Sequence, residues 1–201
     1  MNIRVVLAAI AVIALATTAC ATRYIKPSTV RNPPPVEKFA AFDRFDLTSV
    51  ALDPAYSDHG ANQKAAAKIQ KDFDLKVKPL INGWNGDKPA GQTARTLLIE
   101  PRIEHIKFIG GAARIWVGAL AGSSAIIMKI KYTDRATGKV IAEPEFFQRA
   151  AAMSGAWTFG GQDYAMLSRI VTLVADYTSH NYQQAVGGPS GAPEELVHPA
   201  E

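Results

Sequence analysis

The side chains best suited to chemistry in this chain are its four histidines, because neutral imidazole is both a metal ligand and a general base near neutral pH. They are His59, His105, His180 and His198. A helical zinc site places two histidines three or four residues apart on one face, and no pair here has that spacing. His59 falls in a turn and His198 near the chain end, so we expect both to be exposed. The histidines therefore predict neither a metal site nor a cofactor.

Hydroxyl and carboxylate groups match no catalytic template either. Ser123 and Ser124 open a predicted strand, whereas the nucleophile elbow of a hydrolase places its serine between a strand and a helix. The glycines within residues 110–122 lack the spacing of a phosphate-binding loop. Four glutamates of predicted strands can face one another as two glycosidase carboxylates do, but a solvated face is the simpler interpretation. They are Glu100, Glu104, Glu143 and Glu145. The sequence predicts a non-enzymatic protein with no catalytic residue.

The single cysteine, Cys20, follows a segment with the order of an export signal. A short basic start ends at Arg4, an apolar run covers residues 5–16, and small residues 17–19 come directly before the cysteine. A membrane-spanning helix needs about twenty apolar residues, so this run is too short to cross a bilayer. A plain secretory signal also ends in small residues, but it has no need of a thiol at the cleavage position. Since the chain has one cysteine, an intramolecular disulfide is excluded.

The end of this signal, Thr17-Thr18-Ala19-Cys20, resembles the lipobox of bacterial lipoproteins, which has an aliphatic residue, two small residues and an acylated cysteine. Thr17 stands where leucine is usual. The resemblance implies cleavage before Cys20 and attachment of fatty acyl chains such as palmitate. Stable anchoring takes two or more chains, and lipoprotein maturation supplies three. Ala21 is not the aspartate that retains lipoproteins in the inner membrane of enteric-type bacteria. The resemblance therefore implies the outer membrane, on its periplasmic face.

After the signal peptide (residues 1–19), the chain suits one domain with a tail at each end. Prolines 33–35 make residues 20–38 a proline-rich tether from the lipidated cysteine, and an extended segment of this length reaches up to roughly 50 Å. Residues 39–185 form the predicted periplasmic domain. The Gly/Pro-rich composition of residues 186–201 is typical of a disordered tail. The net charge of +4 is too small to predict nucleic-acid binding.

Hydrophobic periodicity predicts both helices and strands. The strands are expected at residues 39–52, 96–109, 124–133 and 140–150, and the helices at residues 61–82 and 162–184. Even-numbered residues 126–132 are apolar and should face the core, and the strands on either side of the turn after them should form an antiparallel hairpin. Pro101 should lie at an edge or a bulge, and Asn82-Gly83 should end the first helix. This order predicts an α+β fold, a small mixed sheet of about four strands with two helices packed on one face.

Residues 112–124 form an apolar, glycine-rich segment. One interpretation is a loop or short helix pressed on the sheet, where small residues permit close approach. The alternative is a self-association or membrane-touching element, because Gly118 and Gly122 have the spacing with which helices pack closely in lipid. Arg114 argues against simple insertion, while Trp116 suits an interface with a partner or with lipid. We take Arg114, Trp116, Gly118 and Gly122 as the predicted partner-contact residues.

Three features together make the chain resemble small uncharacterised bacterial lipoproteins that are grouped only as domains of unknown function. They are the lipobox-like end at Cys20, the glycine-rich residues 118–122 leading into an alternating strand, and the D-x-x-T-G turn at residues 134–138. The resemblance covers roughly residues 40–184. In layout the chain is also distantly similar to the curli-secretion lipoprotein and to the N-terminal domain of the Tol-system propeller protein. None of these resemblances implies a catalytic residue, and fold alone does not determine function.

These observations predict a non-enzymatic outer-membrane lipoprotein whose periplasmic domain binds another component of the cell envelope. One alternative is an oligomerising accessory subunit of an envelope secretion or transport assembly, although no convincing membrane-crossing hairpin is evident. Another is a small-ligand-binding lipoprotein with an apolar cavity between helix and sheet. The expected partners are the membrane, through the lipid on Cys20, and an envelope protein or a second copy of the chain.

Overall fold

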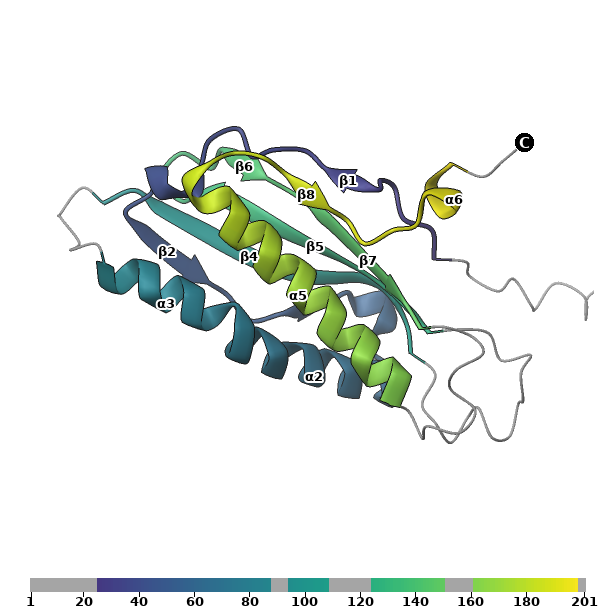
Figure 1. Cartoon of the computed structure of the whole chain (residues 1–201). Coiled ribbons are helices and arrows are strands. Elements are labelled where there is room, and N and C mark those ends of the chain that lie inside the picture. Colours follow the sequence, from purple (N-terminus) through teal and green to yellow (C-terminus); the bar gives the residue numbers. More distant parts are fainter. Residues whose placement is uncertain (1–24, 88–93, 109–123, 151–160, 199–201) are drawn as a thin grey trace, which may run out of the picture.

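A mixed β-sheet organises the structure, and helices cover one of its faces (Figure 1). The computed structural model describes four stretches of the chain, which are residues 25–87, 94–108, 124–150 and 161–198. The strands of the larger sheet are β2 (Arg44–Leu47), β3 (Ala51–Leu52), β4 (Thr96–Lys107), β5 (Ala125–Asp134), β6 (Val140–Ala142) and β7 (Glu145–Arg149). The predicted α+β class, with a mixed sheet and helices packed on it, is confirmed.

The two long strands β4 and β5 form the antiparallel centre of the sheet, and each has two shorter strands in line along its outer edge. Strands β2 and β3 run parallel to β4, whereas β6 and β7 run antiparallel to β5. The predicted hairpin between β5 and the strand that follows it is therefore confirmed. Four strands were expected and six are found, because the first and the last of the expected strands are each interrupted and form two short strands. One interruption falls at residues 48–50 and the other next to Pro144, which has no N–H to donate to a ladder.

Pro101 lies in the middle of β4, although a strand with neighbours on both sides does not ordinarily accept proline. The carbonyls of Ile99 and Ile103 accept hydrogen bonds from the N–H groups that directly follow β2 and β3. Odd-numbered residues of β4 therefore direct their backbone groups toward these two strands. Pro101 consequently faces the interruption between them, where its missing N–H leaves no ladder bond unmade. The register shift of β4 comes later, between Ile103 and His105, so a local edge and not a bulge accommodates the proline.

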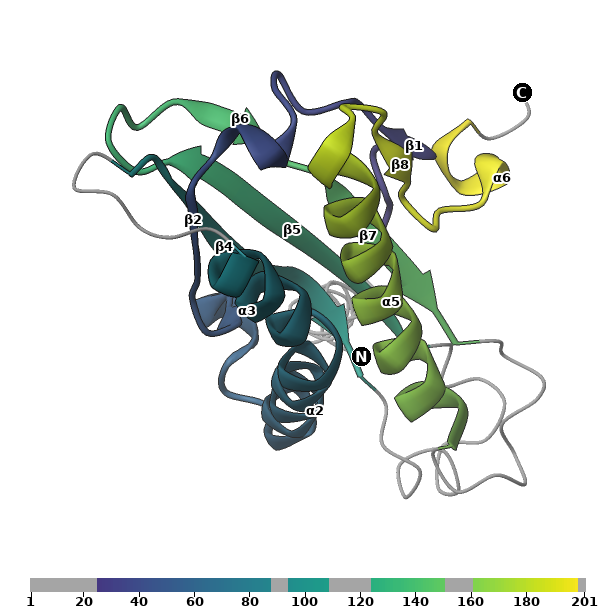
Figure 2. The same ribbon diagram turned by 60° about the vertical axis from the view of Figure 1, so that its left-hand side comes forward.

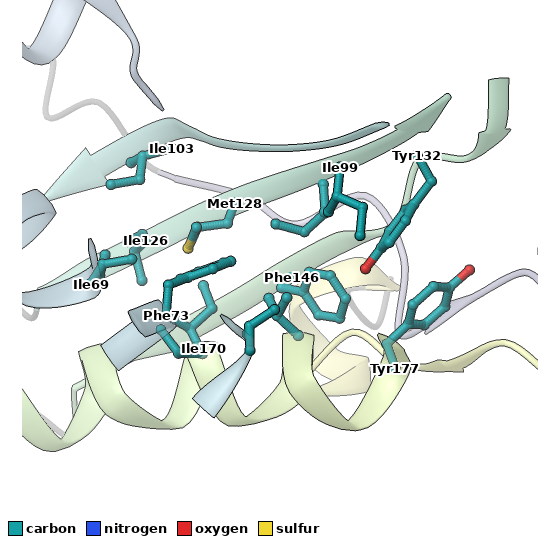
Figure 3. Close-up of a cluster of buried hydrophobic side chains, with 14 of the residues drawn as sticks. Ile69, Phe73, Ile99, Ile103, Ile126, Met128, Tyr132, Phe146, Ile170 and Tyr177 are labelled. Carbon is teal, nitrogen blue, oxygen red and sulfur yellow. The ribbon is translucent and has the colours of Figure 1, made fainter. Parts of the chain in front are cut away.

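Three helices lie on one face of the sheet, as Figure 2 shows. They are α2 (Gly60–Lys76), α3 (Lys78–Asp87) and α5 (Gly161–Gln183). Ile69 and Phe73 of α2 and Ile170 of α5 pack against Met128 in the core between helices and sheet (Figure 3). Even-numbered residues 126–132 of β5 are fully buried in this core, which confirms their predicted direction.

The helix predicted over residues 61–82 is two helices, and the second extends beyond the predicted end. The helix is interrupted at Val77, between the end of α2 and the start of α3. Pro79 falls in the first turn of α3, where a missing N–H removes no helical hydrogen bond. Gly83 does not end α3, because the Asn85 amide is bonded to the backbone of Phe45 in β2. A tertiary contact therefore keeps the chain helical beyond Gly83, although the local sequence favours a helix end there.

The described N-terminal segment, residues 25–38, crosses the domain as a strap. Its short strand β1 (Arg31–Asn32) pairs antiparallel with β8 (Gly188–Pro189) near the other end of the chain. The Ser190 N–H donates to the Val30 carbonyl at 3.0 Å. The remaining short elements are the 3-10 turns η1 (Phe39–Ala41) and η2 (Pro54–Tyr56) and the helix α6 (Glu194–Val197). The first and last described segments are thus bonded to each other.

This arrangement corrects the predicted domain limits. A tether over residues 20–38 and a disordered tail over residues 186–201 were expected, with the domain confined to residues 39–185. The described parts of both segments instead pack on the domain, and Asn32 and Ser190 are almost fully buried. Composition misleads here because each segment is too polar to fold alone, and the pairing between them joins residues that are far apart in the sequence.

Side-chain amides close both edges of the sheet. The Asn32 amide donates to the carbonyl of Glu145 in β7 and accepts from its N–H, both at 2.8 Å. The Asn85 amide makes the same two bonds to Phe45 in β2, both at 2.9 Å. Each amide thus replaces one residue of a neighbouring strand. Because exposed edge strands are templates for pairing with other chains, these contacts reduce the tendency of the sheet to aggregate.

Candidate functional site

The predicted site residues lie outside the described part of the chain. They are Cys20, Arg114, Trp116, Gly118 and Gly122. The structure nevertheless describes the residues to which these segments connect, which are residue 25 and the strands on either side of residues 109–123. Lys107 at the end of β4 pairs with Ala125 at the start of β5. The segment with the four predicted contact residues therefore leaves and rejoins the sheet at one end, which we call the Lys107 end.

A cavity of about 450 Å³ opens at the Lys107 end. Its lining includes the apolar side chains Ile25, Ile106 and Phe108 and the polar side chains Tyr56, His59 and Asn62. The Tyr56 hydroxyl lies 2.8 Å from Nδ1 of His105, and the two rings meet edge to face at 5.8 Å. Small-molecule sites commonly have volumes of roughly 300–1,000 Å³ with a few polar groups among apolar walls. This cavity can therefore hold a small, partly apolar ligand.

The histidines do not assemble a site. All four are exposed, which confirms the expectation for His59 and His198. Within the described ranges, no three side chains of His, Cys, Asp or Glu gather as a metal site. No helix in those same ranges is long and apolar enough to cross a membrane.

Two of the four glutamates, Glu104 and Glu145, take structural roles, whereas Glu143 lies between β6 and β7 and is exposed. Glu104 in β4 forms an ion pair with Lys129 in β5 at 3.0 Å, and this bond raises the pKa of Lys129. Glu145 differs from the solvated side chain expected for it, because it is buried at the strap. Its carboxylate accepts the Ser28 N–H at 2.7 Å. These carboxylates therefore join strands and strap.

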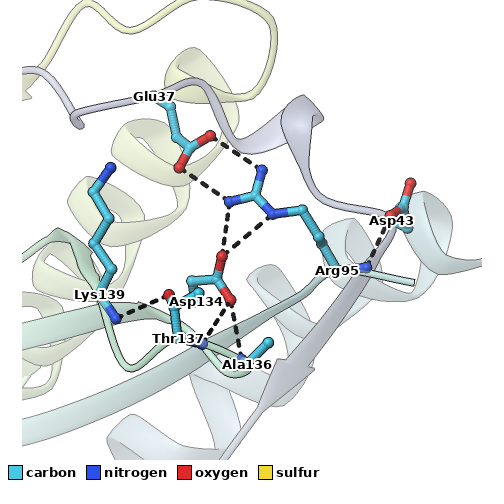
Figure 4. A network of polar contacts seen from close by, with 7 residues as sticks. All are labelled: Glu37, Asp43, Arg95, Asp134, Ala136, Thr137 and Lys139. Carbon is cyan, nitrogen blue, oxygen red and sulfur yellow. Dashed lines mark hydrogen bonds and ion pairs between the residues drawn. The ribbon is translucent and has the colours of Figure 1, made fainter. Parts of the chain in front are cut away.

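Arg95, directly before β4, is the centre of a polar network (Figure 4). Its guanidinium donates to the Asp134 carboxylate at 2.8 Å and to both carboxylate oxygens of Glu37 in the strap, at 3.1 and 3.2 Å. It also lies over the Phe42 ring, 4.3 Å from the ring centre. The bond from Arg95, with the backbone N–H groups of the following turn, lowers the pKa of Asp134. The D-x-x-T-G turn is thus part of a connection between strap, sheet and hairpin.

Three exposed valines lie on adjoining segments near Lys139, at the end of the sheet opposite Lys107. They are Val36, Val140 and Val186, whose exposed fractions are 64%, 41% and 44%. The Val36 N–H donates to the Ile141 carbonyl at 2.9 Å, so the strap lies beside β6. Gly187 lies against the backbone of Pro34 in the same strap. We call these three side chains the valine surface and this end of the sheet the Lys139 end. Apolar side chains exposed on adjoining segments make this region a candidate interaction surface.

Sequence reasoning missed the valine surface because its members are far apart in the sequence. A weak signal was present in two of them. Val36 follows three consecutive prolines and Val186 precedes two glycines, so each is an apolar residue in a segment with no periodic core of its own. Nothing in the sequence joins them, since their proximity depends on the pairing of β1 with β8.

Comparison with known proteins gives limited similarity. No family model matches the sequence, and no curated protein matches it. Among solved structures, the chain is similar to a PelC dodecamer from Paraburkholderia phytofirmans, with 14% identity, a TM-score of 0.39, and coverage of 72% of this chain and 94% of that chain. For protein XCC0632 from Xanthomonas campestris, of family-model DUF330, the identity is 13%, the TM-score 0.40 and the coverage 78% and 95%. The neighbours thus include an uncharacterised domain, and at these TM-scores neither bears on what this chain does.

Proposed function

We propose that this protein is a non-enzymatic outer-membrane lipoprotein, anchored through Cys20, whose periplasmic domain binds another component of the cell envelope. The observation that carries the binding role is the valine surface. Its three side chains are apolar and well exposed, and the bond from the Val36 N–H holds the strap beside β6. Burying apolar area of this kind against a partner is favourable, because it removes that area from water.

The roles of the other polar groups support a binding domain over a catalytic one. Arg95 forms ion pairs with both Asp134 and Glu37, and these pairs fasten the strap. Asp72 and Lys68 of α2 are paired at 2.5 Å, and Ser168 of α5 also donates to Asp72 at 2.7 Å, which joins the two helices. These charged groups are used to hold segments together.

In-cell crosslinking tests the proposal directly. A photoreactive amino acid replaces Val140 in one strain and Trp116 in another, so that the valine surface and the predicted contact residue are probed separately. Leu75 is the matched control, since it is an apolar side chain with 65% exposure on α2, away from the valine surface. We expect one dominant crosslinked envelope protein from position 140 and none from position 75.

Other outcomes distinguish the alternatives. Crosslinked dimers, trimers and higher multiples of this chain from position 140 or 116 would favour the oligomerising accessory subunit. The absence of any crosslinked species from both positions would contradict partner binding. If mass spectrometry of the mature protein finds no acyl group on Cys20, the proposed anchor is contradicted.

A small-ligand-binding role is the second candidate, and the cavity at the Lys107 end favours it. Native mass spectrometry of protein extracted from the envelope would detect a retained small molecule. Ala61 lines the cavity, so Ala61→Phe should fill it and release such a molecule. Ala67→Phe, at an exposed position of the same helix, is the control and should retain it.

A further inference from the structure

We infer that the Lys107 end of the sheet faces the lipid surface and that the domain meets the membrane at Ile25; this inference rests on the proposed acylation of Cys20. Residues 21–24 alone separate that cysteine from Ile25. A fully extended chain spans at most roughly 3.6 Å per residue, so the Cα of Ile25 lies within about 18 Å of the Cα of Cys20. An acylated cysteine sits at the bilayer surface. Ile25 is therefore close to the lipid headgroups, and the longer reach of a free tether is lost.

Ile25 is attached to the face of the sheet opposite the helices. Ala125, Ile127 and Phe147 form a small buried cluster there, against which Ile25 and Leu196 pack. Neighbouring residues of β5 and β7 point into the main core, so the alternation of side chains places this cluster on the other face. The position at which the anchor segment joins the domain is thus defined by apolar contacts.

Beyond Ile25 the strap is bonded along its length, so it does not act as a spare length of tether. Pro27 is buried, and the Ser28 N–H donates to the buried Glu145 carboxylate at 2.7 Å. The Asn32 amide then pairs with the backbone of β7. Releasing more chain for the anchor would require these contacts to break together.

Two basic side chains lie near the point where the anchor segment joins the domain. Lys26 is exposed next to Ile25, and Lys107 lines the cavity that Ile25 also lines. Basic side chains close to a bilayer are attracted by anionic headgroups. A lipid surface is therefore the partner that the short connection to Cys20 favours.

The opposite end of the domain is directed away from the membrane. Strand β4 has 12 residues, and at about 3.3 Å per residue it is roughly 40 Å long. The valine surface lies near the far end of this strand, at the Lys139 end. An orientation with Lys107 toward lipid thus presents the valine surface to the periplasm, where a partner can reach it.

Fluorescence quenching in vesicles tests this orientation. Full-length lipidated protein carrying Lys107→Cys or Lys139→Cys is labelled with a fluorophore, since acylated Cys20 has no free thiol. Each protein is reconstituted into phosphatidylcholine–phosphatidylglycerol vesicles that contain a headgroup nitroxide lipid. We expect strong quenching at position 107 and fluorescence close to the nitroxide-free control at position 139.

The outcomes separate this inference from the anchor itself. Equal quenching at both positions, or stronger quenching at position 139, in protein that floats with the vesicles would overturn the orientation and leave the anchor in place. Protein that lacks the acyl mass and does not float would overturn both. Asn32→Ala, which removes two strap bonds, should reduce the quenching at position 107, whereas Ser28→Ala should not, because Ser28 contacts Glu145 through its backbone. Quenching unchanged by Asn32→Ala would contradict the role of the strap in setting the distance.

Discussion

At the scale of single residues, Arg95 shows how one side chain positions several segments. Its bonds to Glu37 and Asp134 connect the strap to the hairpin, and Phe42 lies beneath its guanidinium. Asp134 is in turn oriented by N–H donors of its own turn, at 3.0 Å from Ala136. A bidentate arginine between two carboxylates fixes geometry as well as charge. The D-x-x-T-G turn therefore has a structural explanation that needs no ligand.

Asp134→Asn should change the pH dependence of stability. The hydrogen bond from Arg95 lowers the pKa of Asp134 in the folded protein, whereas an unfolded aspartate titrates near pH 3.9. The Asp134 contribution is therefore present above about pH 4 and is lost as the pH falls through the lower, folded-state value. We expect urea unfolding to show the variant to be less stable than the parent protein at pH 7 and the difference to shrink at pH 3. A difference that is the same at both pH values would contradict this role for the carboxylate.

At the scale of elements, the sheet edges depend on side chains contributed by other elements. Asn85 belongs to α3 and Asn32 to the strap, yet both act as strand partners. Gln70 of α2 similarly accepts the Val50 N–H at 2.8 Å, in the interruption between β2 and β3. These amides explain how strands as short as β2 are kept in place. They also explain why α3 continues beyond Gly83.

Asn85→Ala should destabilise the protein through the edge of β2. The substitution leaves the N–H and carbonyl of Phe45 without this partner, and unmade hydrogen bonds of partly buried groups cost about 1–3 kcal/mol. Asn82→Ala, at an exposed position of the same helix, makes the same chemical change and should alter stability by less than about 0.5 kcal/mol. Chemical denaturation measures both. Light scattering on warming should show earlier aggregation for Asn85→Ala, and equal behaviour of the two variants would argue against edge protection.

At the scale of the whole molecule, the two ends of the sheet carry different side chains, and the first and last described segments are paired with each other. The strap begins at the Lys107 end and reaches the Lys139 end at Val36, where it bonds to β6. The C-terminal segment returns in the other direction from Val186 to α6. The proposed lipid contact and the proposed partner contact are thus placed at opposite ends of one strap.

Gly187→Ala should detach the two terminal segments from each other. Gly187 has a φ of +70°, and an added Cβ would lie 2.4 Å from the Asn32 carbonyl oxygen. The left-handed backbone alone costs roughly 1–2 kcal/mol for a residue with a Cβ. We expect lower thermal stability and faster tryptic cleavage at Arg31 in the strap. Gly83→Ala is the control, because nothing lies within 4 Å of its Cβ position in a helix, where alanine gains about 1 kcal/mol over glycine. Cleavage at Arg31 that is as slow as in the parent protein would contradict the coupling of strap and tail.

The sequence alone determined the features that depend on near neighbours. Alternation in residues 124–133 predicts which side of β5 is buried, and periods of three and four residues predict the two helical regions. The turn at residues 134–138 predicts the hairpin, and Pro101 predicts an edge or a bulge in the ladder, of which the structure has the edge. The predicted export signal and the resemblance at Cys20 likewise depend on consecutive residues, and both the signal and the lipid anchor stay predictions. Such signals are local, so composition and spacing are sufficient to find them.

Only the tertiary structure decided the features that join distant residues. The pairing of β1 with β8, the Asn85 bond that extends α3, and the bond from Val36 to β6 each bring together segments separated by many residues. Strap and tail look disordered by composition, because neither can bury enough apolar area alone, yet each supplies the hydrogen-bond partners that the other and β7 lack. The predicted contact residues from Arg114 to Gly122 stay a hypothesis. What the structure adds is that their segment begins and ends at the Lys107 end, close to Ile25, where the proposed membrane anchor would join the domain.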